Sequence, residues 1–315
     1  MRPPDALVLG GGGLLGEIWM NAVLTGINDG AGIDVRDSPG FVGTSAGSIV
    51  AVSLAAGVDP YSRLGDGDAD GARRRPTARA DIGPDQAASY RALRGLIDLG
   101  ASAAAPLAAI ALGWGAAAAA GAVARRALLA GLPTGRRSLA YLASSIERLG
   151  VRWDGRLQIA AVDVDSGRRV MFGRPGAPGA DVSQAVQASC AIPGVFRPIR
   201  VDGRSYVDGG VWSPTNLDAA QVSRGSRVLC LNPTGSLRPT PRAPAGALGT
   251  VSRSIAATES LALKQRGAAV TVINPDDASR RAMGLNFFDT RRRAAVVEAG
   301  VAQGKHAAAQ LARAA

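Results

Sequence analysis

The stretch Phe41-Val-Gly-Thr-Ser-Ala-Gly-Ser-Ile-Val-Ala-Val-Ser-Leu-Ala-Ala-Gly57 joins a short apolar run to a helical pattern of small residues. Between the two lies Gly43-Thr-Ser-Ala-Gly47, a Gly-x-Ser-x-Gly pattern that is typical of a nucleophile elbow. The two glycines remove side chains that would collide where a strand turns sharply into a helix. The pattern therefore predicts that Ser45 lies exposed at a helix N-terminus, whose positive end can stabilise an anion.

A glycine-rich segment, Gly10-Gly-Gly-Gly-Leu-Leu-Gly16, separates the apolar run Ala6–Leu9 from Glu17–Ile27, where apolar residues recur at helical spacing. We predict a strand, a glycine loop and a helix. Such a loop presents backbone N–H groups that can hold a phosphate or an oxyanion.

The same glycines also fit a dinucleotide-binding fold, because Gly11-x-Gly13-x-x-Gly16 follows a strand. That fold needs an acidic residue about 20 positions later, at the end of a second strand. The candidates are Asp34 and Asp37, and neither ends an apolar run. A dinucleotide-binding fold also gives no role to Ser45, so this interpretation is the weaker alternative.

Composition narrows the class of protein. The chain has 315 residues, 47% of them hydrophobic, which is enough for a substantial core, and we expect residues 1–315 to form a single domain. Two cysteines, Cys190 and Cys230, lie in apolar surroundings, so a reducing compartment is the simpler interpretation. The short apolar run at the N-terminus does not resemble a signal peptide. The expected location is the cytoplasm, with peripheral association at the inner face of the membrane as an open alternative.

A net charge of +11 predicts attraction to anionic surfaces such as phospholipid bilayers or nucleic acid. Aromatic residues make up only 4% of the chain, without the basic and aromatic clusters that stack bases. We therefore expect transient association with an anionic membrane and no binding to nucleic acid.

The remaining patterns alternate between strand and helix. This alternation favours an α/β fold, specifically a three-layer α/β/α sandwich with a mostly parallel central sheet and functional loops at the strand ends. The predicted strands are Leu157–Val164, Arg169–Phe172, Ile199–Val201, Ser205–Val207, Arg227–Leu231 and Ala269–Ile273, and the predicted helices are 137–149, 181–191, 250–265 and 290–314.

Residues 60–135 are expected to form a helical cap inserted over the core. Residues 65–79 are polar and rich in helix breakers, whereas residues 99–124 are uncharged and rich in alanine, and Arg125-Arg126 follow. We predict that the 99–124 run covers the substrate or faces a membrane without spanning it, because strongly inserting aliphatic residues are few. A buried pair of core helices is the alternative.

A serine becomes a good nucleophile only when a base accepts its proton. His306, the single histidine, lies in a terminal helix pattern, whereas a catalytic histidine is expected on a loop after a strand. The order Ser45, Asp208, His306 still matches a Ser-His-Asp esterase, so that triad stays an alternative. Asp208 is the better base, because it ends a predicted strand before two glycines that let a substrate approach.

Four motifs in order resemble those of the patatin-like phospholipase family, and together they extend over most of the chain. They are Gly11-Gly-Gly-Leu-Leu-Gly16, Gly43-Thr-Ser-Ala-Gly47, Ala188-Ser-Cys-Ala-Ile-Pro193 and Asp208-Gly-Gly210. The resemblance implies hydrolysis of lipid acyl esters through an acyl-serine intermediate, with a lipid as partner and no metal, cofactor or histidine required.

By this resemblance Ser45 is the nucleophile and Asp208 the second member of a Ser-Asp dyad. The amides of Gly11, Gly12 and Gly13 would form the oxyanion hole. The other motif glycines are Gly16, Gly43, Gly47, Gly209 and Gly210.

One position departs from the family pattern. The family usually has a basic residue just before the last glycine of the loop, where this chain has Leu15. Backbone donors do not depend on that side chain, but help from a cation is in doubt, which favours a neutral lipid or an acyl thioester over a phospholipid. A catalytically weak lipid-binding protein that keeps the fold is the alternative from another functional class.

Overall fold

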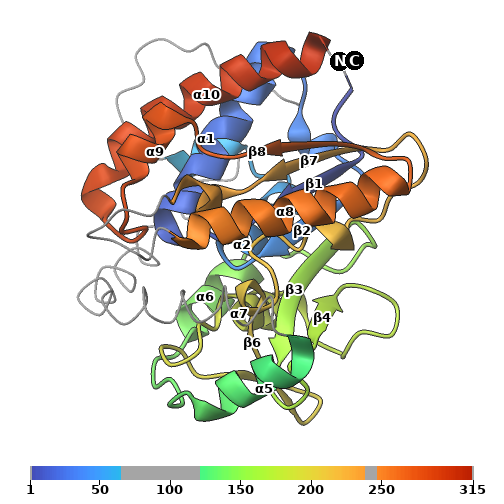
Figure 1. Ribbon diagram of the computed structural model, residues 1–315, viewed down its shortest axis with the longest axis vertical. Helices are drawn as coiled ribbons and strands as arrows, with labels where there is room; N and C mark the ends of the chain where they lie inside the picture. Colours follow the sequence, from blue (N-terminus) through green and yellow to red (C-terminus); the bar gives the residue numbers. More distant parts are fainter. Residues whose placement is uncertain (1, 65–120, 238–246, 314–315) are drawn as a thin grey trace.

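The computed structural model describes residues 2–64, 121–237 and 247–313, and these form an α/β fold around one eight-stranded sheet (Figure 1). The strand order is β5-β6-β3-β2-β1-β7-β8, and β4 pairs with β3 outside this path. The strands are β1 (Ala6–Leu9), β2 (Phe41–Thr44), β3 (Leu157–Asp163), β4 (Arg169–Phe172), β5 (Ile199–Val201), β6 (Arg204–Asp208), β7 (Arg227–Leu231) and β8 (Ala269–Ile273).

The sheet is mixed but mostly parallel, as the alternating pattern predicted. β3, β2, β1, β7 and β8 run parallel, so their carboxyl ends meet at one edge. β4 and β6 are antiparallel to β3, and β5 is antiparallel to β6. The turn between β5 and β6 has positive φ at Asp202 (47°) and Gly203 (77°), the geometry that a tight hairpin needs.

Helices flank the sheet on both faces (Figure 1). In the described residues the α-helices are α1 (Gly13–Ala31), α2 (Ala46–Ala55), α5 (Gly121–Gly131), α6 (Ala140–Glu147), α7 (Val182–Cys190), α8 (Ala247–Gln265), α9 (Asp277–Met283) and α10 (Arg293–Arg313). Short 3₁₀ segments lie at Val35–Asp37, Pro60–Leu64, Gly209–Val211, Leu217–Ala219, Pro233–Ser236 and Thr290–Arg292.

Side chains alternate between two cores along β1. Leu7 and Leu9 join the larger core, to which α1, α2 and α7 contribute. Ala6 and Val8 face a second core that includes Leu263 of α8. Because the side chains of a strand point alternately to its two faces, both faces of the sheet are covered, and the layered α/β prediction is confirmed.

The C-terminal helix α10 packs closely on α1. A Cβ atom on Gly304 would overlap the carbonyl oxygen of Val23, and one on Gly26 would lie 2.9 Å from Gly304 Cα. Trp19 Nε1 also donates to Gln303 Oε1 at 3.0 Å in this contact. The two ends of the chain are therefore joined through backbone contacts that only glycine permits.

Some predicted boundaries were wrong. The first helix begins at Gly13 rather than Glu17, so Gly13 and Gly16 are helical, and a Cβ on Gly16 would lie 3.0 Å from Pro233 Cβ. Helix α9 was not predicted. The helix after the elbow ends at Ala55, slightly before the end of the helical pattern at Gly57.

The predicted polar segment 65–79 and most of the 99–124 run lie outside the described residues. Of the 60–135 region the structure describes the 3₁₀ segment Pro60–Leu64 and residues from Gly121 onward, including α5. Arg125 of α5 is buried, and its guanidinium carbon lies 4.0 Å from the centre of the Trp212 ring, four residues beyond Asp208. Within the part of the chain that is described, every helix is too short or too polar to cross a membrane.

Candidate active site

The elbow has the backbone geometry that its sequence predicted. Ser45 lies between β2 and α2 with φ 51° and ψ −122°, a strained conformation for a residue other than glycine. A Cβ on Gly47 would overlap the carbonyl oxygen of Leu9, and one on Gly43 would lie 2.5 Å from Ser48 Cα. The two glycines thus let α2 pack directly on β1 and β2, which leaves the Ser45 side chain at the parallel strand ends.

Ser45 and Asp208 are brought together by the register of the sheet. Thr44, the last residue of β2, pairs with Ala160 of β3, and β3 continues past that point. β6 runs antiparallel along this extension, so its last residue, Asp208, pairs with Ala161. Ser45 Oγ donates to Asp208 Oδ2 at 2.7 Å, across 163 residues of sequence.

The Asp208 carboxyl is fully enclosed, which changes its acidity. Burial raises the pKa of Asp208 to about 7, while hydrogen bonds from Ser45 and from the Gly210 amide act to lower that pKa. Gly210 N donates to Asp208 Oδ1 at 2.7 Å. A carboxyl with this pKa suits general base catalysis near neutral pH, because it is a far stronger base than an ordinary aspartate.

The glycine loop differs from its predicted use at one residue. Gly11 N donates to the carbonyl oxygen of Pro214 at 2.8 Å, so this amide is already occupied. No acceptor within the described residues pairs with the amides of Gly12 and Gly13, which open α1. Of the three predicted oxyanion-hole amides, those of Gly12 and Gly13 are therefore the ones that could still donate to a ligand, and they lie at the positive end of α1.

Ser189 supports the elbow, a role that the sequence did not reveal. Its Oγ accepts a hydrogen bond from Ser45 N at 2.8 Å. Ser189 lies on α7, whose first turn is closed by a capping box between Asp181 and Gln184. The Ala188–Pro193 motif in the sequence includes this serine, but only the tertiary structure shows that its hydroxyl contacts the backbone of Ser45.

Asn216 connects the segments on either side of the dyad. It is fully buried with φ 49°, and its Nδ2 lies 3.0 Å from Thr44 Oγ1, 2.8 Å from Ser213 O and 3.3 Å from Gly209 O. One amide thus reaches the residue before Ser45 and the residue after Asp208. No local pattern in the sequence marks this role.

Glu259 of α8 holds the same loop from the opposite side. Its Oε2 accepts hydrogen bonds from Thr215 Oγ1 at 2.6 Å and from Leu217 N at 2.8 Å. Burial raises the pKa of Glu259 to about 7. The loop after Asp208 is therefore fixed by buried polar contacts to β2 and α8.

Two residues singled out in the sequence lie elsewhere. His306 is exposed on α10, whereas Asp208 bonds directly to Ser45 with no histidine between them. Leu15 is buried in the core on α1, so its side chain contributes apolar packing where the family has a cation. The motif glycine Gly209 packs on β3, where a Cβ would overlap the carbonyl oxygen of Ala160.

Comparison with known proteins finds similarity to a protein family and to solved structures. A family described as Patatin-like phospholipase matches residues 7–220, a range that contains every predicted site residue. Among solved structures, the crystal structure of VipD from Legionella pneumophila aligns with 98% of this chain and 67% of its own chain, at 16% sequence identity and a TM-score of 0.43.

Proposed function

The chain belongs to the patatin-like phospholipase family, and we propose that it is a serine lipid acyl hydrolase that uses Ser45 and Asp208. The observation that carries this proposal is the 2.7 Å hydrogen bond from Ser45 Oγ to Asp208 Oδ2. A buried carboxylate at this distance can take the serine proton directly, so nucleophile and base are adjacent.

In the proposed reaction Ser45 Oγ attacks the acyl carbonyl carbon of the lipid, and its proton passes to Asp208. The tetrahedral intermediate collapses, the leaving alcohol takes that proton, and the acyl group stays on Ser45. Water then attacks the acyl-serine and gives a proton to Asp208. The second collapse returns the proton to Ser45 Oγ and releases the fatty acid, so Asp208 ends each half-reaction as it began.

The oxyanion of each intermediate would be held by the amides of Gly12 and Gly13 at the N-terminus of α1. The amide of Ala46, at the start of α2, is the donor expected directly after the nucleophile. Two helix N-termini then face the same developing charge, and each adds the positive end of its dipole.

We propose fatty acyl esters of phospholipids or neutral lipids as the substrate class. Leu15 favours neutral lipids or acyl thioesters, because it supplies no cation for a phosphate. We also propose a cytoplasmic protein that associates reversibly with the membrane, with residues 60–135 as the cap over the site. The stacking of Arg125 on Trp212 supports this place for the cap, because Trp212 follows Asp208 closely.

Covalent labelling tests the proposal directly. A fluorophosphonate should label the wild-type protein quickly and should fail to label Ser45→Ala. Asp208→Ala should also lose nearly all ester hydrolysis, because removing either member of such a pair removes most of their shared effect. His306→Ala is the matched control and should keep activity within a few-fold of wild type.

The alternatives predict different results. A histidine-dependent triad would lose about a thousandfold in turnover on His306→Ala. A lipid-binding protein without an activated serine would react with the fluorophosphonate no faster than any folded protein whose serines are not activated. A panel of lipid classes with product analysis then identifies the head group and the acyl position.

A further inference from the structure

The connection between α9 and α10 lies against the glycine loop. Phe287 O accepts a hydrogen bond from Leu15 N at 2.9 Å. A Cβ on Gly13 would lie 3.1 Å from Phe288 Cζ and 3.3 Å from Phe287 Cβ. Both phenylalanines are half-buried and pack against the larger core, so this connection is held firmly next to the proposed oxyanion hole.

The outer side of this connection combines an apolar side chain with positive charge. Leu285 is 60% exposed, which is unusual for a large hydrophobic residue in the described part of the chain. Between positions 276 and 293, five arginines outnumber three acidic residues, Asp276, Asp277 and Asp289, and Asp277 pairs with Arg280 at 2.9 Å. The arginines are Arg280, Arg281, Arg291, Arg292 and Arg293.

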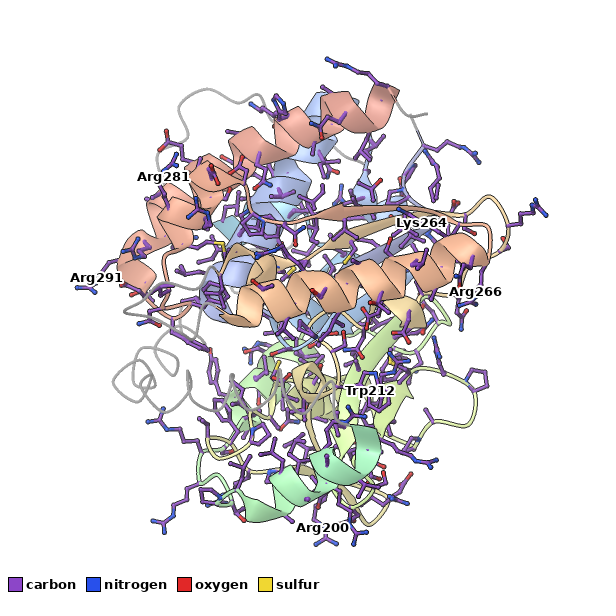
Figure 2. The ribbon with its side chains drawn as sticks, in the orientation of Figure 1. Arg200, Trp212, Lys264, Arg266, Arg281 and Arg291 are labelled. Carbon is purple, nitrogen blue, oxygen red and sulfur yellow. The ribbon has the colours of Figure 1, made fainter. Side chains whose placement is uncertain are left out.

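Two of these arginines, Arg281 and Arg291, project away from the molecule, where they could contact a partner. Arg281 and Arg291 both point into solvent at the end of the molecule where α9 meets α10 (Figure 2), and the Arg291 side chain is 89% exposed. Asp289 pairs with Arg291 at 2.8 Å and lies 3.5 Å from Arg292, so it offsets only part of the positive charge.

We propose that Arg281, Leu285, Phe287, Phe288 and Arg291, here called the 281–291 surface, dock the protein on an anionic lipid bilayer. Arginines attract anionic head groups, and the exposed Leu285 inserts at the boundary between head groups and acyl chains, while the half-buried phenylalanines hold the connection in place against the core. The inference rests on the proposed function in one respect: a docked bilayer would supply substrate beside Gly12 and Gly13. This proximity favours a bilayer over an acidic peptide as the partner.

The molecule contains a matched control surface. On α8 and just after it, Leu261 is 56% exposed, and Lys264 and Arg266 are also exposed. Figure 2 shows Lys264 and Arg266 at the opposite end of the molecule from Arg281 and Arg291. This surface has the same kinds of side chain but lies away from the carboxyl ends of the parallel strands.

The experiment measures binding of the full chain to vesicles of phosphatidylcholine with and without phosphatidylglycerol. All variants carry Ser45→Ala, so that lipid hydrolysis does not change the vesicles. We expect reversible binding to the anionic vesicles that weakens with salt. R281Q/R291Q should weaken this binding by about 25-fold, at about fivefold per arginine, whereas K264Q/R266Q, with the same loss of net charge, should change it by less than threefold.

Leu285→Ser and Leu261→Ser form a second matched pair. Leu285→Ser should weaken binding severalfold and reduce the part that survives high salt, and Leu261→Ser should do neither. With Ser45 restored, R281Q/R291Q should hydrolyse a soluble monomeric ester at the wild-type rate but lose activity on anionic vesicles. This split distinguishes failed docking from failed chemistry.

Three outcomes would overturn the docking proposal. Equal weakening by both double variants would show attraction by overall charge alone. If none of these substitutions changes binding to the vesicles, the contact with the bilayer lies on another part of the protein. Capture of an acidic peptide without binding to vesicles would identify a protein partner. If the protein with Ser45 intact binds the vesicles but hydrolyses none of the substrates, the result would instead contradict the proposed function.

Discussion

At the scale of single residues, Asp208 determines how the site responds to pH. Its pKa is raised to about 7 because burial opposes the charged form more strongly than Ser45 and Gly210 favour it. The proposed base accepts a proton only when it is ionised, so the pKa of Asp208 should set the pH below which ester hydrolysis declines.

The pH profile of kcat/KM should report this carboxyl. We expect activity to rise about tenfold per pH unit below an apparent pKa of about 7, and to level off above it. A soluble ester assayed from pH 5 to 9 gives the profile. An acid limb near pH 4 would mean that Asp208 keeps the pKa of an exposed aspartate or is not the base.

The same pKa has a consequence for stability. The folded state keeps a proton on Asp208 that the unfolded state releases above its own pKa of about 4, so the contribution of this group to stability falls as pH rises from about 4 to about 7. Asp208→Asn removes the titration and keeps an acceptor for Gly210 N. It should raise Tm relative to wild type at pH 8 more than at pH 5. Equal Tm differences at both pH values would contradict the shift.

The glycine loop offers a clean test at one position only. A Cβ on Gly12 would lie 2.6 Å from Pro233 Cβ, so Gly12→Val should disturb folding as well as turnover. At Gly11 a Cβ would lie 3.5 Å from Ser45 Cβ, an ordinary contact. Gly11→Ala should therefore keep Tm within about 2 °C of wild type, since an uncrowded substitution is nearly neutral. It should lower kcat/KM at least tenfold, because its methyl group crowds the approach to the nucleophile.

At the scale of elements, the loop after β6 positions the dyad. Asn216 contacts Thr44 of β2 and Gly209 at the same time, while Glu259 of α8 holds the neighbouring backbone. The turn that Asn216 supports contains Gly210, whose amide bonds to Asp208. We infer that Asn216 is a positioning residue that acts through this turn.

Asn216→Gly should move the pH profile. Glycine accepts the φ of 49° without strain, so the variant removes the side chain and keeps the backbone conformation. The Gly210 bond should weaken, which raises the apparent pKa of the acid limb by about half a unit to one unit. Asn216→Asp keeps the shape but loses the donors, and it should shift the limb in the same direction.

The control for Asn216 is Gln303→Ala. Gln303 also makes several buried hydrogen bonds, with Trp19, Ser279 and the carbonyl of Asn274, but it lies between α1, α9 and α10. The Gln303→Ala variant should lower Tm and leave the pH profile of kcat/KM unchanged. A role for Asn216 in stability alone would give the same unchanged profile.

At the scale of the whole molecule, the two ends of the chain are held together by α1 and α10. Gly304 lies on the backbone of Val23, so Gly304→Leu must separate the helices. We expect a loss of about 3 kcal/mol in unfolding free energy, at the upper end for an overpacked site because the obstacle is backbone. Ala302→Leu, exposed on the same helix, should change stability by less than about 0.5 kcal/mol. Chemical denaturation measures both, and similar values for the two would contradict the contact.

The sequence by itself determined the local features of this protein. Strands β7 and β8, the capped helix α7 and the turn at Ser45 depend on short-range patterning, and the structure has each of them where the pattern placed it. The α/β class followed from the alternation of these elements, and the family from the order of four motifs.

Only the tertiary structure decided how the residues of the site contact one another. The contact between Ser45 and Asp208 depends on where β6 pairs with the extension of β3, and sheet register is set by packing over the whole fold rather than by neighbours in sequence. Pro214 occupies the amide of Gly11, Asn216 bridges the two segments of the dyad, and Phe287 covers the start of α1. Each of these contacts joins residues far apart in the chain, so no local pattern could specify it.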